Sequence, residues 1–87
     1  LVENFIRIVG NPVTISSYAE IEFDNENCLM ASIYSIDGKA LINKDLGYTQ
    51  KGINRLEIGE MFSSLSAGTY LFVVKTAEKA FVAKVVK

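Results

Sequence analysis

Residues 69–87, TYLFVVKTAEKAFVAKVVK, decide the fold of this chain. Two segments rich in β-branched and aromatic residues, 69–76 and 80–87, flank a short polar stretch at 77–79. Within each segment, side chains that would share a face recur at every second position, which is the period of a β-strand. The stretch therefore predicts a β-hairpin with residues 77–79 as its turn.

Both faces of this predicted hairpin are apolar. One face would carry Tyr70, Phe72, Val74, Phe81 and Val85, and the other Leu71, Val73, Val82 and Val86. A small sandwich buries one face of each sheet, so the second set predicts an exposed apolar strip of the kind that marks binding surfaces. An edge strand can also pair with a partner. The expected recognition residues are Gly68, Tyr70, Leu71, Val73, Lys75, Val82, Lys84, Val85, Val86 and Lys87.

The rest of the chain predicts further short strands separated by turns. Strands are expected over residues 5–9, 15–23, 28–36, 39–46 and 53–58. Ala19, Ile21 and Phe23 should share one face of their strand, opposite a wet face, and Leu56 and Ile58 should point inward. Leu29, Ala31 and Ile33 should share one face of a strand that is apolar on both faces, which favours a central strand. Six or seven strands with a turn every 8–12 residues predict an all-β antiparallel sandwich of immunoglobulin-like type.

The predicted connections are rich in residues that favour turns. Residues 24–27 form a polar turn, Asp37-Gly38 a tight hairpin turn, and residues 47–52 a loop. Residues 59–68 are expected to form a short helical or 3₁₀ turn that places Leu65 in the core. Gly68 is expected to adopt a positive φ.

Composition excludes several classes of function. The 87 residues allow one domain, and 9 basic against 10 acidic side chains give a net charge of −1, which does not attract nucleic acid. The chain has no His and a single Cys, so it offers no Ser–His or Cys–His nucleophile and no zinc site. The longest purely apolar run, Tyr70–Val74, is far short of the ~20 residues that span a bilayer. We expect no cofactor, no metal and no catalytic residues.

Four groups of residues suggest chemistry, and for each a plain structural interpretation is favoured. Residues 24–27 could be a Ca²⁺ loop but lack the EF-hand glycine and distal Glu, so a turn is preferred. Glu20 and Glu22 could be glycosidase acids but suit a solvated strand face better. Cys28 has no base and is expected to be a small hydrophobe. The tyrosines that could stack on sugars, but are expected to pack, are Tyr18, Tyr34 and Tyr48.

Five short motifs occur in an order that resembles a known family. They are Asn11-Pro12-Val13, IYSIDGK at 33–39, Gly52-Ile53-Asn54 followed by Leu56 and Ile58, LSAGTYLFVV at 65–74, and KVVK at 84–87. Together they resemble the type A C-terminal sorting domain of the type IX (Por) secretion system, from about residue 11 to 87. The residues that carry the resemblance, outside the hairpin, are Asn11, Pro12, Ile33, Tyr34, Gly38, Lys39, Gly52, Asn54 and Leu65. Gly10 and Ser35 depart from the pattern, standing where the family usually has Pro and Asp.

The resemblance implies a secretion signal of Bacteroidetes-type bacteria. An outer-membrane translocon would recognise the domain in the periplasm and export the attached cargo to the cell surface or the medium. A sortase-like peptidase would usually remove the domain, by a cut upstream of Asn11. Residues 1–10 would then be an upstream linker or a first edge strand, and residues 11–87 the sorting domain. The start at Leu1 suggests a piece of a longer protein.

Two other interpretations of the sequence stay open. A generic immunoglobulin-like or fibronectin-like accessory module, acting as a spacer or glycan binder, would have the same fold. An enzyme is the third class, and the missing His weighs against it. The apolar strip could also join two copies of the domain as a homodimer.

Overall fold

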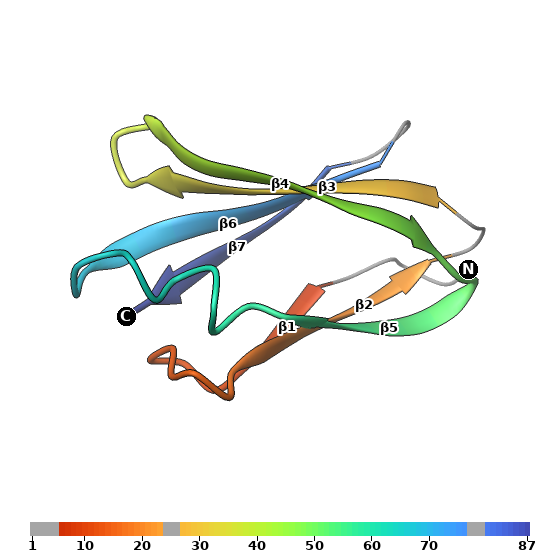
Figure 1. Ribbon diagram of the computed structural model, residues 1–87, viewed down its shortest axis with the longest axis horizontal. Coiled ribbons are helices and arrows are strands. Elements are labelled where there is room, and N and C mark those ends of the chain that lie inside the picture. The colour runs from red at the N-terminus through yellow and green to blue at the C-terminus, as the bar shows by residue number, and fades with distance from the viewer. Residues whose placement is uncertain (1–5, 24–26, 77–79) are drawn as a thin grey trace.

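Seven β-strands form the computed structural model, which describes residues 6–23, 27–76 and 80–87. The strands follow one another along the chain without an intervening helix in the described residues (Figure 1). They are β1 (Ile6–Val9), β2 (Tyr18–Phe23), β3 (Asn27–Ser35), β4 (Ala40–Thr49), β5 (Gly52–Glu57), β6 (Thr69–Lys75) and β7 (Ala80–Val86).

The strands form two sheets that pack face to face, as the two layers of Figure 1 show. The smaller sheet has the order β1-β2-β5 and the larger sheet the order β4-β3-β6-β7. Every pairing is antiparallel. The prediction of an all-β antiparallel sandwich is therefore confirmed.

The core lies between the sheets and is built from alternate residues of each strand. In β2, Ala19, Ile21 and Phe23 are buried while the residues between them are half-buried. Phe23 meets Phe81 of the other sheet edge to face, with ring centroids 5.8 Å apart, a favoured geometry for aromatic pairs. In the other core strands the buried residues are Leu29, Ala31, Ile33, Phe72, Val74 and Val85.

Strand β4 runs further than the sequence indicated. It continues to Thr49, so the loop expected over residues 47–52 is wrong. The register between β3 and β4 shifts at this place, because Leu29 pairs with Gly47 and Met30 with Asp45. Gly47 has a φ of +74°, and its N–H donates to the Asp45 carboxylate over 2.8 Å. The glycine thus marks a β-bulge inside a strand.

The segment between β5 and β6 also differs from the prediction. Residues 59–65 make hydrogen-bonded turns without a helix, and Phe62 is fully buried at their centre. Leu65 packs against the core, as expected, from a half-buried position. The prediction of a positive φ at Gly68 is wrong, since the positive-φ glycines are Gly10, Gly38, Gly47 and Gly52.

Strand β2 starts at Tyr18, three residues later than predicted, because residues 14–17 form a turn instead. The N-terminal segment 6–9 is the edge strand β1, and Ile6 and Ile8 pack against the core. Some predictions fall outside the described residues. They are the turns over residues 24–26 and 77–79, the strand assignment of residue 5, and the environment of the Cys28 side chain.

Candidate functional site

The hairpin β6–β7 pairs without a register shift from Thr69 opposite Val86 to Lys75 opposite Ala80. Gly68 and Lys87 extend it with two reciprocal backbone hydrogen bonds, of 3.1 and 2.8 Å. Such reciprocal pairs alternate with non-bonded pairs along an antiparallel ladder. The backbone groups of β7 residues 81, 83 and 85 therefore point toward β6, and those of residues 80, 82, 84 and 86 point away.

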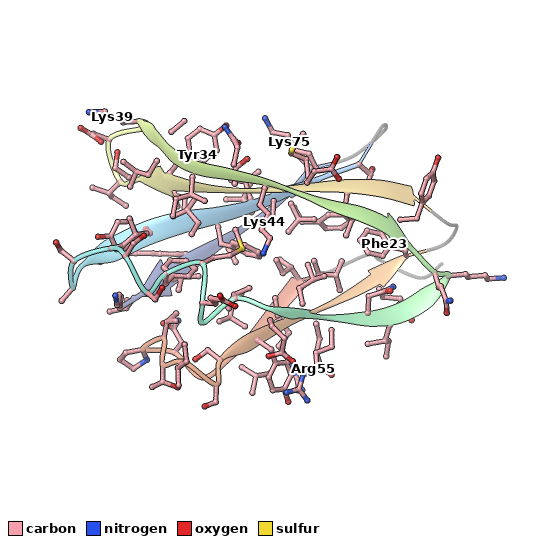
Figure 2. The ribbon with its side chains drawn as sticks, viewed as in Figure 1. Phe23, Tyr34, Lys39, Lys44, Arg55 and Lys75 are labelled. Atoms are coloured by element: carbon pink, nitrogen blue, oxygen red, sulfur yellow. The ribbon has the colours of Figure 1, made fainter. Side chains whose placement is uncertain are left out.

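The outer face of this hairpin, turned away from the small sheet, is apolar and cationic. We call it the hairpin face and define it by Leu71, Val73 and Lys75 of β6 and Val82, Lys84 and Val86 of β7. Val82 is 57% exposed and Val86 38% exposed. Lys75 and Lys84 are exposed, and neither strand contains an acidic residue. Figure 2 shows Lys75 and Tyr34 of the neighbouring β3 standing on this side of the larger sheet.

The hairpin face is continuous with the outer face of β3 and β4. One row across the sheet consists of Asn43, Ser32, Val73 and Val82. The Ser32 hydroxyl donates to the Asn43 side-chain oxygen. The Lys75 ammonium lies 6.0 Å from the centroid of the Tyr34 ring, at the limit of a cation–π contact.

Val73 is less exposed than the sequence predicted. Its side chain points outward, yet it is only 8% exposed. The reason is its place on β6, a central strand, where Ser32 flanks it on β3 and Val82 on β7. The exposed part of the hairpin face is therefore concentrated on β7, because no further described strand covers it.

Two predicted recognition residues face the core instead. Val85 is fully buried, because its position in β7 places it on the inner face with Phe81. Tyr70 packs its ring edge to face on Phe62, with centroids 5.9 Å apart, and its hydroxyl donates to the Ser66 carbonyl over 2.6 Å. The assignment of Val85 to an exposed contact surface is wrong, because its side chain is fully buried. Tyr70 is half-buried and packs against the core, so both residues stabilise the sandwich.

Lys87 ties the end of the hairpin to the turn segment 59–65. Its ammonium donates hydrogen bonds to the backbone carbonyls of Phe62, Ser63 and Leu65. An ammonium has three N–H groups, so these carbonyls match its full capacity. The structure thus gives Lys87 a structural role, while Lys84 remains exposed on the hairpin face.

The Asn-Pro-Val motif meets the hairpin at the same end of the molecule. The Asn11 side-chain oxygen accepts the N–H of Val86 over 2.8 Å, and the N–H of Val13 donates to the Val86 carbonyl over 2.7 Å. Pro12, between them, follows a cis peptide bond. This contact brings together the first and the last of the five sequence motifs.

The IYSIDGK motif builds the turn between β3 and β4. Gly38 has a φ of +93°, which favours glycine. The Ser35 hydroxyl accepts the N–H of Lys39 over 3.0 Å and donates to the Asp37 carboxylate. The hydrogen bond from Ser35, followed by Asp37's own backbone N–H, holds the pKa of Asp37 below its usual value. Ser35 therefore stabilises the turn.

The Gly-x-Asn motif begins β5, at the end of the sandwich opposite the IYSIDGK turn (Figure 1). Gly52 has a φ of +104°. The Asn54 amide donates to the carbonyls of Gln50 and Gly52, over 2.8 and 3.2 Å. These contacts close a turn, and they leave Gly52 and Asn54 outside the hairpin face.

Two residues that the sequence did not single out, Ser17 and Gly59, hold together the end of the molecule that contains Asn11. The buried Ser17 hydroxyl accepts the N–H of Thr14 and donates to the Gly10 carbonyl, over 2.8 and 2.7 Å. A Cβ on Gly59 would lie 2.3 Å from the Ile15 carbonyl oxygen. Two features of the sequence could have indicated these residues. Ser17 is polar at a position that continues the apolar series Ala19, Ile21 and Phe23, and Gly59 directly follows the apolar Ile58.

The opposite face of the molecule carries paired charges. Arg7 of β1 forms an ion pair with Glu20 of β2, and Arg55 stacks on the Tyr18 ring, 3.8 Å from its centroid. The Arg55 side chain projects outward from the small sheet in Figure 2. Since Arg7 neutralises Glu20 and Arg55 covers Tyr18, this face has the character of a solvated strand surface.

The tyrosines considered for sugar stacking are dispersed over both sheets. Tyr18 lies on β2 of the small sheet, and Tyr34 and Tyr48 lie on β3 and β4 of the larger one. Tyr48 is exposed. Within the described ranges there is no cluster of three His, Cys, Asp or Glu suited to a metal ion. Nor does that part of the chain contain a helix that could cross a membrane.

A comparison with protein families matches residues 10–87 to the secretion system C-terminal sorting domain. Searches among curated proteins and among solved structures found no match. The matched region includes the hairpin, the Asn11–Val86 contact and both motif turns, and begins just after β1. Domains of this family are the C-terminal signals of type IX secretion and direct the attached protein to the cell surface or out of the cell. By this match the chain belongs to the family of secretion system C-terminal sorting domains.

Proposed function

We propose that the folded sandwich is read as an address by the type IX outer-membrane translocon, and that the hairpin face is the contact surface. The observation that carries this proposal is the exposure of Val82 and Val86 beside Lys75 and Lys84. Apolar area of this kind stabilises a complex, and charges at its border set orientation. Recognition would take place in the periplasm, before the cargo crosses the outer membrane.

The proposal assigns different tasks to the predicted recognition residues. Leu71, Val82 and Val86 would supply contact area, and Lys75 and Lys84 would meet acidic groups of the translocon. Gly68 and Lys87 would act indirectly, because they fix the end of the hairpin by their hydrogen bonds. The domain itself would bind and not catalyse.

The test introduces a glutamate in place of one exposed apolar residue on each sheet. A reporter protein carrying this chain is expressed in a type IX-competent cell, and its delivery to the surface is measured. Val82→Glu should reduce delivery at least tenfold, because a carboxylate interrupts the apolar surface. The matched control is Ile53→Glu, which changes a 68% exposed residue of the small sheet and should leave delivery within twofold. Equal delivery by both variants would refute the assignment of the surface.

A peptidase that removes the domain would cut upstream of Ile6. Residues 6–9 pair with residues 18–21 of β2, so their backbone is engaged in a sheet. Peptidases bind substrates as extended chains with free backbone groups, which a paired strand does not offer. We therefore assign β1 to the domain that is released, although the family match begins at Gly10.

A further inference from the structure

The open edge of β7 differs from the other three sheet edges. Exposed edges are usually protected by short strands, bulges or charges, including charges that point inward. Strand β1 has four residues and carries Arg7. Strand β5 is protected by its polar residues Asn54, Arg55 and Glu57. Strand β4 has two register irregularities, and Lys44 sits on its inner side opposite the buried Ala31; Figure 2 shows Lys44 between the two layers.

Strand β7 has fewer of these protections, although β1 of the small sheet lies beside it. It runs for seven residues without a register shift, and Lys84 is its single charged residue. The backbone groups of Val82 and Lys84 point away from β6, as the ladder alternation established. Within residues 6–23, 27–76 and 80–87, no backbone or side-chain group bonds to them from that side.

Among the described residues, hydrogen bonds from another segment close this edge at its end. There Asn11 and Val13 bind both backbone groups of Val86 from the open side, and so stand where an added strand would begin. This contact leaves residues 80–84 as a defined stretch of open edge. It also shows that a backbone N–H from another segment, that of Val13, can bond to this edge.

We propose that the β7 edge from residue 80 to residue 84 binds an extended acidic segment of the translocon, which adds to the larger sheet as a fifth strand. The inference rests on the proposed function and names the mode of binding. Backbone hydrogen bonds to Val82 and Lys84 supply the pairing, as in other cases of strand addition. The segment is acidic because Lys84 lies on this edge and Lys75 on the adjacent strand, with no carboxylate on either strand.

Proline substitution tests the backbone part of the proposal. Val82→Pro removes an N–H that makes no bond to β6, so the hairpin keeps its ladder, and proline is tolerated at such edge positions. The matched control Val82→Ala keeps the N–H and also loses apolar area. Delivery of the reporter should fall at least tenfold for Val82→Pro and no more than about threefold for Val82→Ala. Equal delivery by the two variants overturns strand addition.

Hydrogen exchange of the unmodified chain gives a second readout that does not depend on a variant. Solubilised translocon should slow exchange of the Val82 and Lys84 amides at least tenfold, while the amides of Phe81 and Ala83 are already protected by β6. Unchanged exchange at residues 82 and 84 in the bound chain overturns the proposal. A dimer in sedimentation that Val82→Pro converts to monomer, with delivery unaffected, would assign the edge to a second copy and also overturn it. Failure of the unmodified chain to deliver the reporter would refute the proposed function itself.

Discussion

Gly59 shows how a single residue without a side chain can position a loop. Its α-carbon lies so close to the carbonyls of Thr14 and Ile15 that a methyl group would meet their oxygens at 2.5 and 2.3 Å. The same approach lets the N–H groups of Ile58 and Gly59 donate to the Ser17 carbonyl, each over 3.2 Å. The glycine therefore fixes the loop that carries Asn11 to its place beside Val86.

We predict opposite outcomes for alanine at the two glycines of this segment. Gly59→Ala should lower the free energy of unfolding by about 1–3 kcal/mol, since backbone must move to admit the methyl group. Gly68→Ala should leave it unchanged or raise it by up to about 1 kcal/mol, because no atom lies within 3.9 Å of the new carbon and the φ of Gly68 is not positive. Urea unfolding of both variants measures the difference. A larger loss of unfolding free energy for Gly68→Ala than for Gly59→Ala would contradict the role given to Gly59.

The strands were predictable wherever their alternation was decided by burial on one face. Ala19, Ile21 and Phe23 identified both β2 and its inner side, because a one-residue slip would expose all three. The hairpin β6–β7 was equally clear, although two of its expected contact residues, Tyr70 and Val85, belong to the core. Alternation alone cannot say which of two apolar faces is the inner one.

The connections were less predictable, since long-range contacts determine them. Gly47 indicates a loop in the sequence, but pairing with β3 carries the strand past it through a bulge. The role of Lys87 depends on three carbonyls more than twenty positions away. Nothing in the local sequence distinguishes this lysine from Lys84, which is exposed.

The turn between β3 and β4 should respond to acid in a definite direction. A lowered pKa of Asp37 in the folded chain means that its ionised form is favoured by folding. The contribution of Asp37 to folding stability is therefore complete at a pH above the ordinary aspartate pKa. It is lost as the pH falls through the lower pKa that Asp37 has in the folded chain. An NMR titration should place the midpoint of Asp37 below that of an unfolded peptide. Ser35→Ala should move it upward, and an unchanged midpoint would contradict the role of Ser35.

At the scale of the whole molecule, stability depends on both sheets being complete. A domain of 87 residues has a thin margin of stability, and its core here spans strands that lie far apart in the sequence. Strand β1 lies outside the family match, yet Ile6 and Ile8 pack on this core and Arg7 pairs with Glu20. The packing around the core therefore extends beyond the region that the family comparison matches.

A chain that starts at Gly10 should fold less stably than one that keeps β1. Removing two half-buried isoleucines costs about 2 kcal/mol of burial, and it also uncovers the edge of β2. Thermal unfolding of the two chains, side by side, measures the effect. Arg7→Ala in the longer chain is the control, and should cost less than about 1 kcal/mol because its ion pair is exposed. Equal stability of the two chains would show that β1 is dispensable and would remove the reason for placing the peptidase cut upstream of it.

The bond between Asn11 and Val86 joins positions that are 75 residues apart. A ribosome synthesises Asn11 long before Val86, so the loop that contains Asn11 can adopt its final contact only after β7 has been made. A polypeptide interrupted before residue 80 lacks β7, and with it the β7 part of the hairpin face. The larger sheet is therefore complete only after residues 80–86 have been synthesised. The contact surface proposed for the translocon would thus be present in finished chains and absent from truncated ones.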